Sequence, residues 1–455
     1  MNEIAPAPFS PAPFAVEERV RIPVEAYVSP DYARAENEKL WPKVWQIACR
    51  EEELKKVGDY VTYDILDESI IVIRSGPDEI SAFYNVCPHR GRRITKGCGH
   101  AQRLHCRFHG WGWDISGNST YVLDAEDWGD AVAPEKIALK PIRVDTWGGW
   151  VWINMDPDCV SLEEYLGPAW TILGRLKIER MRYRWRQWLY FPCNWKTALE
   201  SFIESFHVDG THPQLVQWGS NRWWCRTGGL HAWHGVGEGR GGTTRVGSTS
   251  TGVSAAEGMD PRVTMAELFT ELWETVGTST QTLVDAANRL VHDLPEGTPA
   301  EQVAGHMMHT AAMMDAERGV YWPELSPEEF AEAGLDWHIF PNTAILPGIT
   351  YTLCYRARPN GYDPDSCIFE VYILEHFPEG QEPETEWVFE PDPTEEKWRL
   401  ILSQDFQNIA EIQKGMKSRG YDGGMPSPYQ EVPVIHFHRT LARFMGSGAP
   451  VPLDG

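Results

Sequence analysis

The feature that most constrains the fold is a repeated pairing of one cysteine with one histidine. Cys87 and His89 are separated by one residue, and Cys106 and His109, separated by two, follow after sixteen intervening residues. Each pair predicts a short loop that carries one thiolate and one imidazole to a common point. Zinc sites usually space their ligands as Cys-x2–4-Cys and His-x3–5-His, whereas mixed pairs suit a [2Fe-2S] cluster in which one iron binds both cysteines and the other both histidines. The fold must therefore bring two loops together, with structural zinc as the alternative to the cluster.

The residues around these loops predict a small antiparallel β domain. Between about residues 58 and 155, short β-branched and aromatic runs alternate with Gly, Asp and Pro, which is typical of strands and turns. The stretch that links the two pairs holds basic residues and no acidic ones, namely Arg90, Arg92, Arg93, Lys96, Arg103 and Arg107. In a chain of net charge −24, this stretch is either a set of solvated loops or a docking surface for an acidic electron donor or a neighbouring subunit.

The rest of the chain predicts a larger α+β domain. Helical patterns near residues 161–176, 194–208, 262–292, 300–317 and 394–417 alternate with strand-like runs at 184–191, 337–340, 344–357 and 367–377. This order indicates an antiparallel sheet with helices packed on it. The predicted organisation is an N-terminal arm and helix (residues 1–40) packed on the larger domain, the small β domain (41–156) and the larger domain (157–455).

A second candidate site lies in the helical pattern at 194–208. At about 100° per residue, Glu200, Glu204 and His207 form a polar stripe, and an Asp-Gly dipeptide then predicts a helix end that lets His212 fold back towards His207. The apolar face of the same helix is predicted to hold Trp195, Leu199, Phe202 and Phe206. Two histidines at this spacing are weak support for a metal site on their own.

An acidic residue on an apolar helix face strengthens the case. In the helix predicted at 394–417, Asp405 falls within an apolar stripe formed by Trp398, Ile409, Ile412 and Met416. A buried, unpaired carboxylate costs several kcal/mol, so it needs a cation or a proton. A metal ion bound by His207, His212 and Asp405 answers that need, and two histidines with one carboxylate are typical of non-haem Fe(II) oxygenases.

Composition narrows the function classes further. The chain has 455 residues with 41 Lys and Arg against 65 Asp and Glu, and this acidic balance disfavours binding to nucleic acid or to an anionic membrane surface. No apolar run approaches the roughly 18 residues of a membrane span, and the Pro-rich N-terminal residues carry no recognisable secretory signal. The nine cysteines are scattered and odd in number, which favours metal or cluster ligation over disulfides. The expected location is cytoplasmic.

Together, the two candidate sites resemble those of Rieske non-haem iron oxygenases, the alpha subunits of ring-hydroxylating dioxygenases and their monooxygenase and demethylase relatives. The similarity covers nearly the whole chain, in motifs that begin at Cys87, Cys106, Asn194, Trp337 and Ser403. It implies a Rieske [2Fe-2S] domain and a helix-grip catalytic domain. The implied ligands are Cys87, His89, Cys106 and His109 for the cluster, and His207, His212 and Asp405 for a mononuclear Fe(II).

The resemblance also implies an assembly and an electron path. A homotrimer (α3), with α3β3 as a second form, would pass electrons from the Rieske centre of one subunit to the iron of its neighbour through a bridging carboxylate. By motif position this carboxylate is Glu204, where the family more often has Asp and where Glu also occurs in relatives that oxidise quaternary ammonium compounds. Electrons would come from a separate ferredoxin or reductase, so NAD(P)H would act only indirectly, with O2 as co-substrate.

The favoured function is a terminal oxygenase of aromatic hydrocarbon catabolism that hydroxylates an aromatic or other small apolar substrate, with cis-dihydroxylation favoured. Family analogy places Ser201, Phe202 and Val208 at the substrate pocket. One alternative is a Rieske monooxygenase or demethylase that acts on a bulky or quaternary ammonium substrate. An alternative of a different class is an electron-transfer or zinc-stabilised binding protein.

Two further patterns compete with these sites. His306 and His309 are spaced for one face of a predicted helix and could bind a metal, although no matching carboxylate accompanies them. The glycine pattern GEGRGG at residues 237–242 satisfies a dinucleotide-binding consensus, but no helical pattern follows it. A surface loop is therefore expected there.

Overall fold

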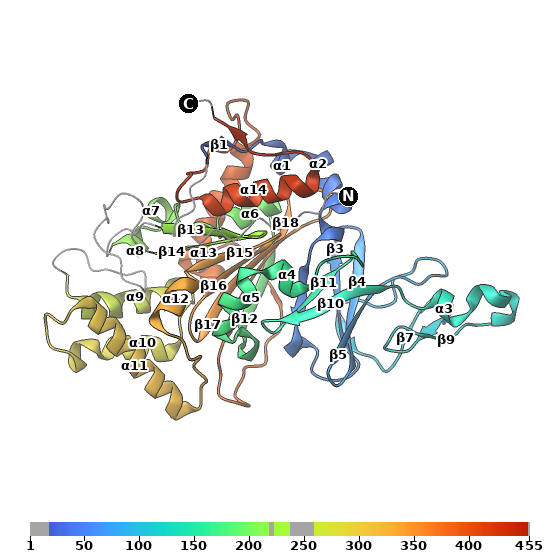
Figure 1. Ribbon diagram of the computed structural model, residues 1–455, viewed down its shortest axis with the longest axis horizontal. Coiled ribbons are helices and arrows are strands. Elements are labelled where there is room, and N and C mark those ends of the chain that lie inside the picture. The colour runs from blue at the N-terminus through green and yellow to red at the C-terminus, as the bar shows by residue number, and fades with distance from the viewer. Residues whose placement is uncertain (1–17, 218–222, 237–258, 454–455) are drawn as a thin grey trace. The chain divides into compact units, whose positions relative to one another are not determined.

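The computed structural model describes residues 18–217, 223–236 and 259–453 (Figure 1). Contacts divide the chain into a smaller unit, Arg34–Tyr165, and a larger unit that combines the residues up to Ala33 with those from Leu166 onwards. The domain boundaries placed after residues 40 and 156 stay predictions. Within the described ranges, every helix is too short or too polar to cross a membrane. The GEGRGG pattern lies outside the described residues.

The smaller unit is built on an antiparallel sheet, as predicted. Its seven strands in sheet order are β2 (Gln46–Arg50), β11 (Trp150–Asn154), β10 (Pro141–Trp147), β5 (Glu79–Tyr84), β4 (Glu68–Gly76), β3 (Asp59–Ile65) and β6 (Cys98–His100). A second sheet consists of β7 (Leu104–His105), β8 (Gly112–Trp113) and β9 (Ser119–Tyr121), and it is followed by helix α3 (Pro134–Ile137). The apolar core includes Ile71, Phe83 and Trp113, and both Cys87 and Cys106 are part of it.

The larger unit contains an eight-stranded sheet. Its strands in sheet order are β13 (Trp223–Gly228), β14 (His231–Val236), β15 (Asp336–Ile339), β16 (Thr343–Pro347), β17 (Tyr351–Pro359), β18 (Cys367–Glu375), β12 (Arg182–Phe191) and β19 (Val388–Phe389). Neighbouring strands are antiparallel except β12 and β19, which are parallel. Helices on this sheet confirm the predicted α+β class.

Some helices of the larger unit pack on the sheet and others pack on one another. α6 (Trp195–Glu200) packs against β17 and β18, and α14 (Val432–Met445) packs against β13 and β14, whereas α9 (Pro261–Thr275), α10 (Gln281–Asp293) and α11 (Ala300–Arg318) pack on one another (Figure 1). A short two-stranded sheet joins β1 (Val20–Arg21) to β20 (Val451–Pro452). The helices are α1 (Glu25–Val28), α2 (Pro30–Lys39), α4 (Leu162–Leu166), α5 (Pro168–Ile172), α6 (Trp195–Glu200), α7 (Val208–Thr211), α8 (Pro213–Val216), α9 (Pro261–Thr275), α10 (Gln281–Asp293), α11 (Ala300–Arg318), α12 (Pro327–Ala333), α13 (Glu395–Gly415) and α14 (Val432–Met445).

Three predicted helices are wrong in extent, and the one predicted at 194–208 ends at Glu200. The single helix predicted at 262–292 is two helices, because Gly277 and Ser279 adopt positive φ values of 77° and 76° and the Thr280 side chain caps α10. The helix predicted at 161–176 is broken into short pieces at Gly167, whose φ is 47°, and Pro168 then begins α5. Helix α14 was not predicted at all.

A triad of charged side chains joins the adjacent strands β17 and β18 of the larger sheet and contributes to its stability. Glu370 on β18 pairs with Arg356, its direct cross-strand neighbour on β17, and with Arg358 at 3.0 Å. Burial alone would raise the pKa of Glu370, but the two guanidinium groups lower it from 4.5 to about 2. This carboxylate therefore contributes stability above pH 4.5 that is lost as the pH falls from 4.5 towards 2.

Replacing Glu370 by Gln is expected to reduce the free energy of unfolding at pH 7 by about 3 kcal/mol, because the buried Arg356 and the partly buried Arg358 lose this counter-charge. Urea unfolding should show this difference from the wild type shrinking below pH 4.5. Asp422→Asn is the matched control, because its carboxylate is 78% exposed and lies 3.7 Å from Arg21. A difference that persists unchanged at pH 3 would contradict the assignment.

Candidate metal centres

The two cysteine–histidine loops of the smaller unit have the same backbone hydrogen bonds. The Cys87 carbonyl accepts from the Gly91 N–H, and the Cys106 carbonyl accepts from the Gly110 N–H, both at 2.9 Å. Each cysteine N–H donates to the carbonyl of the residue five positions later. Gly91 and Gly110 have φ values of 72° and 78°, a left-handed conformation that favours glycine. The shared Cys-x3-Gly spacing therefore builds two matching turns.

The two histidines on these turns lie side by side, and the two cysteines are also neighbours. The rings of His89 and His109 lie 4.6 Å apart between centroids, and both thiols are buried. Burial raises the pKa of the Cys87 thiol, and the neighbouring Cys106 thiol raises it further. His89 Nδ1 is buried without a hydrogen-bond partner among the described residues. This set of two sulfur and two nitrogen donors fits a Rieske-type [2Fe-2S] cluster, although the ligand assignment stays a prediction.

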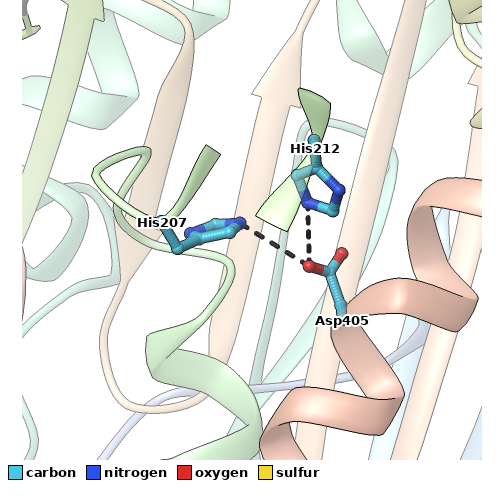
Figure 2. Close-up of side chains that lie close together, drawn as sticks. All are labelled: His207, His212 and Asp405. Carbon is cyan, nitrogen blue, oxygen red and sulfur yellow. Dashed lines mark ion pairs between the residues drawn. The ribbon is translucent and has the colours of Figure 1, made fainter. Parts of the chain in front are cut away.

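The larger unit brings His207, His212 and Asp405 together (Figure 2). His212 Nε2 lies 2.9 Å from Asp405 Oδ1, and His207 Nε2 lies 3.6 Å from the same oxygen. His212 and Asp405 are buried, whereas the His207 side chain is 25% exposed. One donor atom from each residue falls within 4.8 Å of the others, a spacing that fits a single metal ion.

Polar neighbours fix the orientation of both imidazole rings. His207 Nδ1 lies 2.6 Å from Glu204 Oε1, and His212 Nδ1 lies 2.8 Å from Gln404 Oε1. A carboxylate or amide oxygen only accepts, so each Nδ1 carries the proton and each Nε2 keeps its lone pair for a metal. Burial would lower the pKa of His207, but Glu204 and Asp405 raise it, which shows that the surroundings favour a positive charge.

The predicted helix that was to carry the first histidine ends early. α6 stops at Glu200, and His207 precedes α7 instead of continuing α6. The Glu204 carboxylate accepts from the N–H groups of Phe206 and His207, so these groups are not available to extend α6. Glu200 lies away from this contact and pairs with His438 at 2.6 Å. The predicted polar stripe is therefore wrong, and so is the buried position of Phe206, which is 50% exposed.

Helix α13 presents the predicted aspartate from a buried face. Asp405, Ile409 and Met416 are buried as expected, whereas Ile412 is 45% exposed and was wrongly placed. The helix is interrupted at Arg399, whose φ is 65°, so a uniform spacing of 100° per residue does not hold along the segment. Asp405 nevertheless remains among apolar neighbours.

Gln404 is a site residue for which the sequence predicted no role, although it directly follows Ser403, where one of the family motifs begins. Its Oε1 accepts from both His212 Nδ1 and, at 2.7 Å, Gln214 Nε2. Gln404→Leu is expected to weaken ferrous iron binding roughly 10- to 100-fold, since the His212 ring loses its fixed orientation. Anaerobic competition with a chelator measures this, and Gln404→Glu, which keeps an acceptor, should restore most of the affinity. Equal affinities of the wild type and the Leu variant would refute this role.

An apolar cavity of about 250 Å³ lies beside the triad. Ser201, Phe202 and Val208, the predicted pocket positions, line it. Helix α9 and the residue that follows it add three apolar side chains that the sequence did not identify, Leu268, Leu272 and Val276. The described residues that line the cavity include no Lys or Arg that could pair with an anionic substituent.

The rival histidines do not form a comparable site. His306 Nε2 lies 3.5 Å from Asp293 and His309 is exposed on α11. Over the described ranges, the triad of His207, His212 and Asp405 is the one group of three such side chains whose donor atoms approach closely enough for a single ion.

Comparisons with known proteins agree with this architecture. The family model "Ring hydroxylating alpha subunit (catalytic domain)" matches residues 169–447, and the model "Rieske [2Fe-2S] domain" matches residues 44–127. The oxygenase subunit of carnitine monooxygenase from Escherichia coli K12 is 31% identical over 218 residues, which are 47% of this chain and 58% of that protein. The alpha subunit of benzene 1,2-dioxygenase from Pseudomonas putida F1 is 32% identical over 201 residues, 43% of this chain and 44% of that protein. The matches thus span about half the length of these relatives.

Solved structures share the fold over most of the chain. A quaternary ammonium Rieske monooxygenase in complex with L-carnitine is 19% identical, with a TM-score of 0.59 over 94% of this chain and 96% of that one. Naphthalene 1,2-dioxygenase from Rhodococcus sp. is also 19% identical, with a TM-score of 0.60 over 93% and 94% of the two chains. The chain therefore belongs to the family of ring-hydroxylating alpha subunits, which join a Rieske [2Fe-2S] domain to a catalytic domain.

Proposed function

We propose that this protein is the terminal oxygenase component of a Rieske oxygenase system. The observation that carries the proposal is the triad of His207, His212 and Asp405 beside an apolar cavity. When ferrous iron is bound by such a triad, it supplies dioxygen activation at the positions that the protein ligands leave open. The chain itself holds both Nε2 atoms and the carboxylate in place and surrounds the reaction space with apolar side chains, which keep water away.

The electron path proposed for this chain runs through Glu204. Its carboxylate contacts His207 Nδ1 at 2.6 Å, so the side chain reaches the ring despite being one methylene longer than Asp. In the proposed homotrimer (α3, or α3β3 with a second subunit), the Rieske cluster of one subunit would pass electrons through this carboxylate and His207 to the iron site of the next. A separate ferredoxin or reductase would supply the cluster, with the basic stretch between the cluster loops as a docking surface, so NAD(P)H would act only through that carrier.

The proposed reaction is cis-dihydroxylation of an aromatic substrate, and the lining of the cavity supports the apolar character of that substrate. Leu215, Leu346 and Leu353 line it together with the α9 side chains, and an apolar molecule gains most from such surroundings. The second candidate is monooxygenation or demethylation of a quaternary ammonium compound, which Glu204 and the likeness to carnitine monooxygenase support. Carnitine also carries a carboxylate, for which the described lining offers no Lys or Arg.

Product analysis with ¹⁸O-labelled dioxygen tests the proposal. Iron-loaded protein, a ferredoxin with its reductase and reduced nicotinamide would be mixed with a panel of aromatic, polycyclic and quaternary ammonium compounds. Two labelled oxygen atoms in a cis-diol support dihydroxylation, whereas one labelled atom or a released methyl group supports the second candidate. Turnover with reduced nicotinamide and no added carrier would overturn the proposed electron path.

A further inference from the structure

Asp336 is a buried carboxylic acid that opens into the same cavity. It is the first residue of β15, where its backbone pairs with His234 on β14. The residue is 3% exposed and is one of the side chains that line the cavity. It is not one of the proposed metal ligands, and the next residue of the chain, Trp337, begins one of the motifs shared with the family. An acidic side chain at this position therefore needs its own explanation.

The carboxyl group lacks a full set of partners within the protein. Its Oδ1 atom is buried and has no hydrogen-bond partner in the part of the chain that the structure describes. Burial raises the pKa of Asp336 well above its usual range, the charge of Glu204 raises it further, and the Trp337 N–H acts in the opposite direction. The surroundings therefore favour the protonated form of this group, and a protonated carboxyl group both donates and accepts hydrogen bonds.

A buried polar atom without a hydrogen bond destabilises the protein, unless a ligand in the cavity supplies the missing partner. Leu335, Leu346 and Leu353, which line the cavity, offer no hydrogen bond to this carboxyl group. A leucine or alanine in place of Asp336 would avoid the cost, so the acid is better explained by what enters the cavity than by packing. A site that forms a hydrogen bond with one substituent of its substrate binds analogues without that substituent more weakly, because the buried polar group then stays unpaired.

We propose that Asp336 is a specificity-determining residue whose carboxyl group hydrogen-bonds a single oxygen substituent, a carbonyl or hydroxyl group, on an otherwise apolar and uncharged substrate. This inference rests on the proposed function and narrows its substrate class. An anionic substituent is disfavoured, because Glu204 and Asp405 also line the cavity and no described lining residue is Lys or Arg. A cationic substituent is disfavoured as well, because a buried ion pair with Asp336 would have to repay the desolvation of both charges.

The test uses matched probes that differ in one oxygen atom. Binding of 1-tetralone and of tetralin to the iron-loaded holoenzyme would be measured by calorimetry without oxygen. The wild type is expected to bind the ketone at least roughly 10-fold more tightly, which is the effect of one hydrogen bond to a buried group. Asp336→Leu should reduce this ratio to less than about twofold, whereas Asp336→Asn, whose amide still donates, should keep most of it.

The outcomes separate this inference from the proposed function. A wild-type protein that binds the ketone no better than the hydrocarbon, or that binds 1-aminotetralin, as its ammonium ion, more tightly than the ketone, overturns the role of Asp336. If Asp336→Leu does not fold, infrared spectroscopy of the wild type decides, since the carbonyl stretch of the bound ketone must lie below its frequency in an apolar solvent, where the carbonyl has no hydrogen bond. Oxygenated product from either probe supports the proposed oxygenase function, whatever the ratio of the two affinities. Absence of product from every compound of the substrate panel counts against the oxygenase function and not against the role of Asp336.

Discussion

Replacing Asp405 by Ala is expected to remove the mononuclear iron and to lower oxygenation by at least roughly 100-fold, while the visible spectrum of the Rieske cluster stays unchanged. Asp405 supplies the negatively charged donor of the triad, with Oδ1 at 2.9 Å from His212 Nε2 and 3.6 Å from His207 Nε2. Loss of a residue that only orients a ligand already costs about 10- to 100-fold in metal affinity or activity, so loss of a ligand costs more. Iron analysis and product formation measure the two effects separately.

The matched control removes a carboxylate from the same helix. Glu411 on α13 pairs with Lys414 at the surface, and both side chains are 71% exposed. Glu411→Ala should therefore keep iron content and turnover near the wild-type values. Bleaching of the cluster spectrum in Asp405→Ala would show that the aspartate had been assigned to the wrong centre, and full activity would show that it binds no metal.

Replacing Cys106 by Ala is expected to abolish the red-brown colour, the acid-labile sulfide and all turnover that depends on an electron carrier. The thiol is buried in the core of the smaller unit beside Cys87, and a [2Fe-2S] cluster with two cysteine ligands on one iron loses half of the sulfur donors of that iron. The iron of the triad should remain, because no residue of the triad belongs to this unit. Absorption spectra and the iron-to-sulfide ratio provide the measurement.

Cys98 offers the control within the same unit. It lies on β6 between the two loops in sequence, but its side chain is exposed. Cys98→Ala should keep the colour and the sulfide content. If Cys106→Ala kept its colour while Cys98→Ala lost it, the ligand set would have to be redrawn. If the wild type contained zinc and no sulfide, the cluster itself would be refuted.

The two cluster loops could be predicted as short loops because their determinants are local, although the role of the two glycines was not predicted. Each loop needs a cysteine, a histidine within three residues and a glycine four residues after the cysteine, and all of these stand in the sequence next to one another. Gly91 and Gly110 then adopt the positive φ values that close the two turns. Little of this depends on distant parts of the chain.

The triad could be predicted as a set of residues but not as a helix face. The prediction assumed that α6 continues to His207, whereas the Glu204 carboxylate binds the N–H groups of the residues that follow it. A helical wheel does not include such a side-chain contact to the backbone. The prediction of Asp405 depended instead on the cost of burying a charge, which applies whatever the exact path of the helix.

The walls of the cavity could not be predicted, because they come together only in the tertiary structure. Leu268 and Leu272 of α9 are ordinary apolar helix residues in the sequence, and only the packing of α9 places them beside the triad. Asp336 directly precedes a motif that was recognised at Trp337, and its burial depends on the neighbouring strands. Nothing in the local sequence distinguishes it from an exposed aspartate at the start of a strand.

Anomalous X-ray diffraction at the iron absorption edge, from crystals of iron-loaded protein, tests the central claim most directly. The account predicts a peak in the larger unit at bonding distance, roughly 2.0–2.3 Å, from Nε2 of His207, Nε2 of His212 and a carboxylate oxygen of Asp405. It also predicts a stronger peak among the cysteine–histidine loops. A map without density among the three side chains, or with the mononuclear iron beside His306 instead, would contradict the account.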